Sequence, residues 1–126
     1  MKKSNINKNA LYESHLLEDW FSPKIIASLN NEYIKVVKIK GDKVPWHNHE
    51  NSDKLFYLLE GKLLMEIESS KAFYMNTGDL FVVQKGINHR VSSVDECKIM
   101  LIERKDTLHT GTVLSEITKT LDDQVY

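Results

Sequence analysis

The stretch GDKVPWHNHENSDKLFYLLEG, residues 41–61, decides the fold of this chain. His47 and His49 lie two residues apart, and alternate side chains of an extended chain share one face, so both imidazoles can converge on one point. Neutral imidazole is the commonest metal ligand in proteins. Histidines are also common on surfaces, so this pair by itself is weak evidence for a metal site.

A second stretch, GDLFVVQKGINH, residues 78–89, places His89 after an apolar run and a glycine turn. The spacing of glycines and histidines in these two stretches resembles the two signature motifs of the cupin superfamily. The matching positions are Gly41, His47, His49 and Gly61 in the first stretch, and Gly78, Gly86 and His89 in the second. The match covers residues 41–93, and the whole layout is similar to small single-domain bacterial cupins, which include RmlC-like and mannose-6-phosphate isomerase-like proteins.

This resemblance implies an all-β fold, an antiparallel double-stranded β-helix (the jelly-roll or cupin barrel), with a short helix before it. It also implies a site inside one mouth of the barrel. Cupins typically hold a divalent metal, here Fe, Mn, Ni or Zn, through three histidines and a glutamate. His47 and His49 match the first two histidine ligands, and His89 matches the third.

The residue pattern favours the same architecture independently of the resemblance. Short apolar runs rich in Val, Ile, Phe and Tyr alternate with turn residues and predict strands, at residues 34–40, 55–59, 63–67, 80–83 and 99–102. No run in the middle of the chain is long enough for a crossover helix, so we expect antiparallel pairing. One domain covers residues 1–126: a flexible start (1–9), a helical segment (10–22), the barrel (25–113) and a C-terminal arm (114–126).

Lys54 is the main departure from the cupin pattern. It stands seven residues before Gly61, where relatives carry the glutamate ligand. An ammonium ~4 Å from a divalent cation would be repelled by about 8 kcal/mol at an effective dielectric of ~20. Three arrangements are open. Lys54 turns away from a three-histidine metal site; a bulge brings Asp53 inward as the ligand; or no metal binds, and the histidines with Lys54 form a basic pocket for an anion.

These arrangements lead to two hypotheses of different classes. Phe56 and Leu58 share a face with Lys54 on an ideal strand, so we expect these three residues to line a substrate pocket. The first hypothesis is a metal-dependent enzyme, oxygenase-like or isomerase-like, acting on a small organic acid or sugar. The alternative is a metal-free, non-catalytic module that captures a small anionic ligand. The fold does not decide between them, and no catalytic residue is identified.

Composition narrows the partners. The chain has 126 residues and a net charge of −1, so nothing indicates a nucleic-acid or membrane partner. Cys97 is the only cysteine, which fits a reducing compartment, and we expect a cytoplasmic protein. Exposed sheet edges are often paired between subunits, so we also expect a homodimer that binds a small-molecule ligand.

Overall fold

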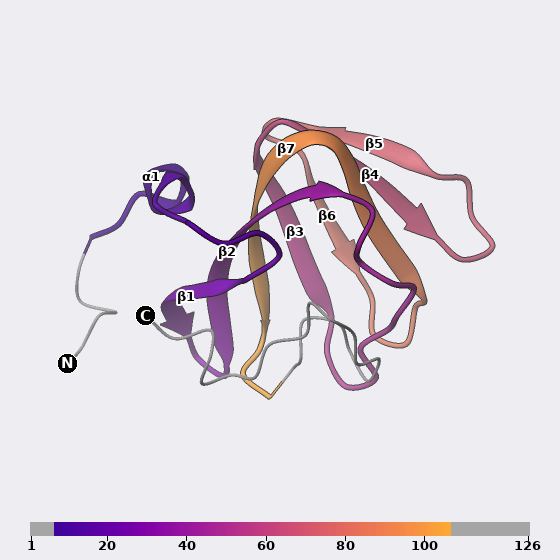
Figure 1. Ribbon diagram of the computed structural model, residues 1–126. Coiled ribbons are helices and arrows are strands. Elements are labelled where there is room, and N and C mark those ends of the chain that lie inside the picture. Colours follow the sequence, from indigo (N-terminus) through magenta and orange to yellow (C-terminus); the bar gives the residue numbers. More distant parts are fainter. Residues whose placement is uncertain (1–6, 107–126) are drawn as a thin grey trace.

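The computed structural model describes residues 7–106, which form antiparallel β-structure preceded by one short helix (Figure 1). The elements are α1 (Ala10–His15), β1 (Lys24–Leu29), β2 (Glu32–Gly41), β3 (Lys54–Glu60), β4 (Lys62–Ile67), β5 (Phe73–Asn76), β6 (Leu80–Val83) and β7 (His89–Arg104). This arrangement confirms the predicted all-β class with a short N-terminal helix. The expected C-terminal arm lies outside the described residues.

Each run predicted as a strand falls within an observed strand. β7 begins at His89, ten residues before its predicted start, because pairing with β4 extends it. β1 and β5 were not predicted. Asn9 caps α1 by accepting a hydrogen bond from the Tyr12 backbone N–H at 2.9 Å. The helix ends at His15, earlier than its apolar spacing suggests.

The strands pair in the order β1-β2-β7-β3-β6, and β4 pairs with both β5 and β7. β7 is 16 residues long. Its later part pairs with β2 and β3, and its first residues pair with β4. Figure 1 shows this strand arching over the molecule from one layer to the other. The two ends of β7 therefore carry side chains to different parts of one interior.

Alternation in these strands builds the core. In β3 the buried and less buried positions alternate from Lys54 to Leu58, and Phe56 and Leu58 are almost fully buried. The main cluster of buried apolar side chains comprises Phe21, Val37, Ile39, Phe56, Leu58, Leu63, Met65, Met75, Val83, Val91, Cys97, Ile99 and Leu101. Lys54 falls in the same inward phase as this core, so the sheet geometry directs it to the interior.

Gly61, at the turn between β3 and β4, shows why one motif position requires glycine. Its φ is +104°, a region that residues with a Cβ rarely adopt. A Cβ placed there would lie 2.7 Å from Cys97 Cβ. The close approach of the turn to β7 therefore excludes any side chain.

Within residues 7–106, none of the helices has the length and apolar character that crossing a membrane requires. β1 lies at the edge of the sheet. The expected homodimer stays a prediction, which light scattering can test.

Candidate metal centre

Three histidines from the two motifs meet inside the barrel. His47, His49 and His89 are 3%, 5% and 0% exposed. Each offers one ring nitrogen, and these nitrogens all lie within 4.8 Å of one another. The ring centroids of His47 and His89 are 4.4 Å apart, and His49 lies 5.0 and 5.7 Å from them. The spacing of the three side chains fits common coordination of a single ion.

Backbone pairing positions these residues. The N–H of His47 donates to the carbonyl of His89 at 3.0 Å, and the N–H of His89 donates back to the carbonyl of His47 at 2.9 Å. The N–H of Gly86 donates to the carbonyl of His49 at 2.9 Å. The loop that carries the first two histidines is thus joined by main-chain hydrogen bonds to the segment that carries the third.

A backbone carbonyl fixes the tautomer of two of the rings. Nδ1 of His47 lies 2.8 Å from the carbonyl oxygen of Pro45, and Nδ1 of His89 lies 2.9 Å from that of Ile87. A carbonyl only accepts, so each Nδ1 carries the hydrogen and donates it. Each Nε2 then carries the lone pair that a metal requires, and this is the usual outer-shell support for a histidine ligand.

The protonation of His89 also fits a metal ligand. Burial lowers the pKa of His89 to about 4; the bond to the Ile87 carbonyl opposes this shift, and the charge of Lys54 adds to it. The imidazole is therefore neutral at pH 7. Its Nε2 is buried and has no hydrogen-bond partner among the described residues. Buried polar atoms are normally satisfied, so a metal ion is a suitable partner for this nitrogen.

Lys54 belongs to a second buried group, which we call the ion cluster: Lys35, Lys54 and Glu103. Lys35 Nζ lies 3.0 Å from Glu103 Oε1, and Lys54 Nζ lies 3.6 Å from Glu103 Oε2. The three side chains are at most 4% exposed. Burial lowers the pKa of Lys54, Glu103 opposes that shift, and Lys35 reinforces it. Lys54 therefore stays inside the barrel and is anchored by a carboxylate from β7.

Asp53 faces the other way. Its residue is exposed, and Oδ1 accepts a hydrogen bond from the Lys85 backbone N–H at 2.9 Å. The pairing of β3 with β6 runs without a break from Lys54 opposite Val83 to Tyr57 opposite Leu80. The described strand therefore has no bulge at its start, and the arrangement in which Asp53 turns inward is not the one observed.

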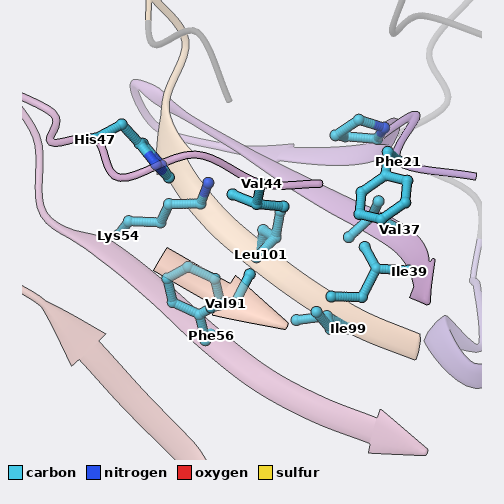
Figure 2. A pocket seen from close by; sticks show the side chains of 11 residues that line it. Phe21, Val37, Ile39, Val44, His47, Lys54, Phe56, Val91, Ile99 and Leu101 are labelled. Atoms are coloured by element: carbon cyan, nitrogen blue, oxygen red, sulfur yellow. The ribbon is translucent and has the colours of Figure 1, made fainter. Parts of the chain in front are cut away.

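A small cavity of about 40 Å³ borders one of the three histidines, His47. Figure 2 shows Lys54 and His47 among the side chains that line it. Phe56 also lines it, whereas Leu58 is fully buried in the core and is not among the lining residues. The lining residues are Phe21, Pro23, Val37, Ile39, Val44, His47, Lys54, Phe56, Val91, Ile99 and Leu101.

Sequence reasoning missed Lys35 and Glu103, although a signal was present. Strand alternation places Lys35 on the same face as Val37 and Ile39, and it places Glu103 on the same face as Leu101. A charged residue in the inward phase of an apolar strand is rarely buried without a partner of opposite charge. One inward lysine and one inward glutamate on two strands thus indicate a buried ion pair.

Comparisons with known proteins agree with the fold and with the positions of the two motifs. The family described as "Cupin domain" matches residues 35–103. A cupin-2 domain containing protein from Shewanella frigidimarina superposes with a TM-score of 0.72 at 32% identity, covering 77% of this chain and 93% of its own. A Neisseria meningitidis protein gives 0.71 at 27% identity, covering 79% and 99%. The uncharacterised protein YdbB of Bacillus subtilis is 29% identical over 80 residues, 64% of this chain and 70% of its own.

Proposed function

Because the chain belongs to the cupin domain family, we propose that it holds a divalent metal ion through His47, His49 and His89 and acts on a small molecule bound in the adjoining cavity. The observation that carries this proposal is the convergence of three buried ring nitrogens within 4.8 Å. Fe, Mn, Ni or Zn are the candidate ions, since imidazole ligands suit these metals.

The electrostatics of the histidines support metal binding at neutral pH. Metal ligands must be deprotonated, so protons normally compete with the ion. With a pKa of about 4, His89 carries no proton at pH 7. The carbonyls of Pro45 and Ile87 hold Nδ1 of two rings, so Nε2 is the donor on both. The chain thus spends no free energy on deprotonating His89 or on turning these two rings.

Three protein ligands are typical of catalytic metal sites, which keep further positions for water or substrate. A metal bound here would supply Lewis-acid polarisation of a substrate oxygen or, if it is iron, activation of oxygen. His47 borders both the three-histidine cluster and the cavity. A ligand in the cavity would therefore lie next to His47, one of the three residues that would hold the metal. We propose oxygenase-like or isomerase-like chemistry.

The cavity lining favours a small organic acid over a sugar. Nine of its eleven residues are apolar, and the other two are His47 and Lys54. Sugar hydroxyls would lie against apolar side chains without hydrogen-bond partners, which costs free energy. An acid needs a polar partner only at its carboxylate and can bury its remaining atoms against the apolar wall.

Metal titration tests this proposal. Protein purified without added metal would be analysed for metal content and then titrated with Fe²⁺, Mn²⁺, Ni²⁺ and Zn²⁺ by calorimetry. We expect one ion per chain, loss of that binding in His89→Ala, and unchanged binding in His15→Ala. His15 is a suitable control because its side chain is 48% exposed. If no ion reaches stoichiometric occupancy or raises the melting temperature, the metal proposal is wrong.

Activity needs a separate readout. Loaded protein would be mixed with a panel of small carboxylic acids, and oxygen consumption and product formation would be followed. Turnover that disappears in His89→Ala and persists in His15→Ala supports an enzyme. Full metal occupancy without turnover of any acid in the panel would contradict catalysis on a small organic acid.

A further inference from the structure

We propose that the cavity is a binding site for a short-chain monocarboxylate, whose carboxylate contacts Lys54 beside His47 and whose hydrocarbon part lies against the apolar wall. This inference rests on the proposed function, because it names the ligand class of the same site. It also assigns a role to the lysine that stands where cupins usually carry a glutamate.

The first observation is how polarity is distributed in the cavity. Figure 2 shows His47 and Lys54 lying together, with Phe21, Val37 and Ile39 farther from them. A site with two nitrogens together and hydrocarbon elsewhere matches a molecule with one polar end. An amphiphile with a single charged group fits this distribution, whereas a molecule polar along its whole length does not.

The second observation is the charge that surrounds Lys54. Glu103 is the carboxylate that pairs with both Lys35 and Lys54, and the contact with Lys35 is the shorter, 3.0 Å against 3.6 Å. Glu103 therefore restrains Lys54 at the cavity while it also pairs with Lys35. A positively charged Lys54 would attract the carboxylate of a ligand in the cavity, whereas it would repel a cation.

Lys54 can hold a ligand and Glu103 together. An ammonium group has three N–H donors in different directions. Its Nζ lies 5.2 Å from the centre of the Phe56 ring, and that ring also lines the cavity. The Lys54 ammonium is therefore within the cavity wall while Glu103 restrains it. A carboxylate placed there would receive a charge-assisted hydrogen bond, which is stronger than a neutral one.

The size of the cavity sets the length of the acid. A cavity needs a volume of ~10–15 Å³ to hold one buried water, and this cavity has a volume of about 40 Å³. The space suits a ligand of a few heavy atoms, such as propionate or butyrate. Inorganic phosphate offers oxygens on all sides and has no part that would bury against the apolar residues.

Calorimetric titration of metal-free and metal-loaded protein with propionate and butyrate tests the inference. Butyramide and butylamine serve as ligands of similar shape without negative charge, and phosphate serves as an anion without hydrocarbon. We expect the two carboxylates to bind and the other three to bind at least about tenfold more weakly. Equal affinity for butyrate and butyramide, or no binding of any carboxylate, would overturn the inference.

Two variants locate the site. Lys54→Met removes the charge but keeps most of the chain length, and we expect butyrate to bind at least about tenfold more weakly. Lys40→Met is the matched control, because Lys40 is an exposed residue of β2. The affinity of this variant for butyrate should equal that of the unchanged protein. Butyrate binding unchanged in a folded Lys54→Met would refute the assignment.

A variant that fills the cavity keeps the test decisive if Lys54→Met does not fold. Val37→Phe places a larger apolar side chain in the part of the lining that lies away from Lys54 in Figure 2 and leaves every charge in place. We expect butyrate to lose affinity by about tenfold while acetate loses less, because only the longer chain meets the new ring. Equal losses for both acids, or none, would contradict binding in this cavity.

Metal content measured on the same samples separates the two proposals. Protein that binds metal through the histidines but no carboxylate overturns this inference and leaves the metal proposal standing. Protein that binds butyrate through Lys54 but binds no metal overturns the metal proposal and leaves this inference standing.

Discussion

The three-histidine cluster and the ion cluster share one interior but are built in opposite ways. The histidine rings come from two short motifs, and a carbonyl two residues back along the chain holds Nδ1 of His47 and of His89. Lys35, Lys54 and Glu103 come from β2, β3 and β7 and hold one another by charge. The ring orientations in the first cluster depend on local main chain, whereas the side chains of the second are held by charged partners on other strands.

This contrast indicates which cluster tolerates change. A neutral imidazole that loses a neighbour leaves a polar ring, whose desolvation costs little compared with that of an ion. A buried carboxylate that is removed leaves two ammonium groups inside the barrel. Stability should therefore respond most to the ion cluster, and metal binding most to the histidines.

Glu103→Gln is the sharpest way to break this contrast. It removes the shared counter-charge, and we expect the free energy of unfolding to fall by about 3–5 kcal/mol. Chemical denaturation measures the loss. The triple change Lys35→Met, Glu103→Leu and Lys54→Met should recover most of it, because buried ion groups can be replaced by apolar ones. If Glu103→Gln lowers the free energy of unfolding by less than ~1 kcal/mol, the ion cluster contributes no more to stability than an ordinary residue does.

The pH dependence of metal-free protein probes the histidine side. The pKa of His89 is about 4 in the fold, against 6.5 for the ordinary group. Above pH 6.5 the His89 imidazole is neutral in both the folded and the unfolded protein. Between pH 6.5 and 4 only the unfolded state gains the proton, so stability falls as pH falls. At 1.36 kcal/mol per pH unit the full loss is about 3 kcal/mol. Denaturation at pH 7 and pH 4 should show this loss, and His89→Gln should lack it.

The coupling between the clusters is a smaller effect. Lys54→Met removes a positive charge that lies close enough to lower the pKa of His89, and the same charge would repel a divalent ion at the histidines. We expect the affinity for Zn²⁺ to rise by about 10–100-fold. Competition with a chelator of known affinity measures it. Unchanged Zn²⁺ binding would show that the two clusters are independent, and weaker binding would contradict the expected repulsion.

Asp53→Asn should have the smallest effect. The carboxylate is exposed and accepts a hydrogen bond from the Lys85 N–H. The amide oxygen can still accept this bond, so we expect stability to change by less than ~1 kcal/mol. Metal affinity should not change in the same chelator assay. A large drop in metal affinity would instead identify Asp53 as a ligand and contradict the arrangement described above.

The same contrast explains how far the sequence could be interpreted. Period-2 alternation and the spacing of the two motifs predicted the barrel and indicated that His47 and His49 share a face, because both are local properties. The meeting with His89 required the resemblance to cupins, since it depends on pairing across the barrel. The distance of seven residues from Lys54 to Gly61 identified Lys54 as the residue at the usual glutamate position. It did not predict which residue Lys54 pairs with.

Glu103 could not be assigned as that partner from the sequence. It lies 49 positions from Lys54 along the chain, and the contact depends on the pairing of β7 with both β2 and β3. Its inward phase in β7 was nevertheless readable. Inspecting each strand for charged residues on the apolar face would have found Lys35 and Glu103 as candidates for a buried pair.

The reciprocal backbone bonds between His47 and His89 have a consequence for the rate of metal uptake. Two main-chain hydrogen bonds fix both residues before any ion arrives, so binding loses little conformational entropy. We therefore expect the rate of metal binding to be limited by the loss of water ligands from the ion. Metals that exchange their water more slowly should bind more slowly.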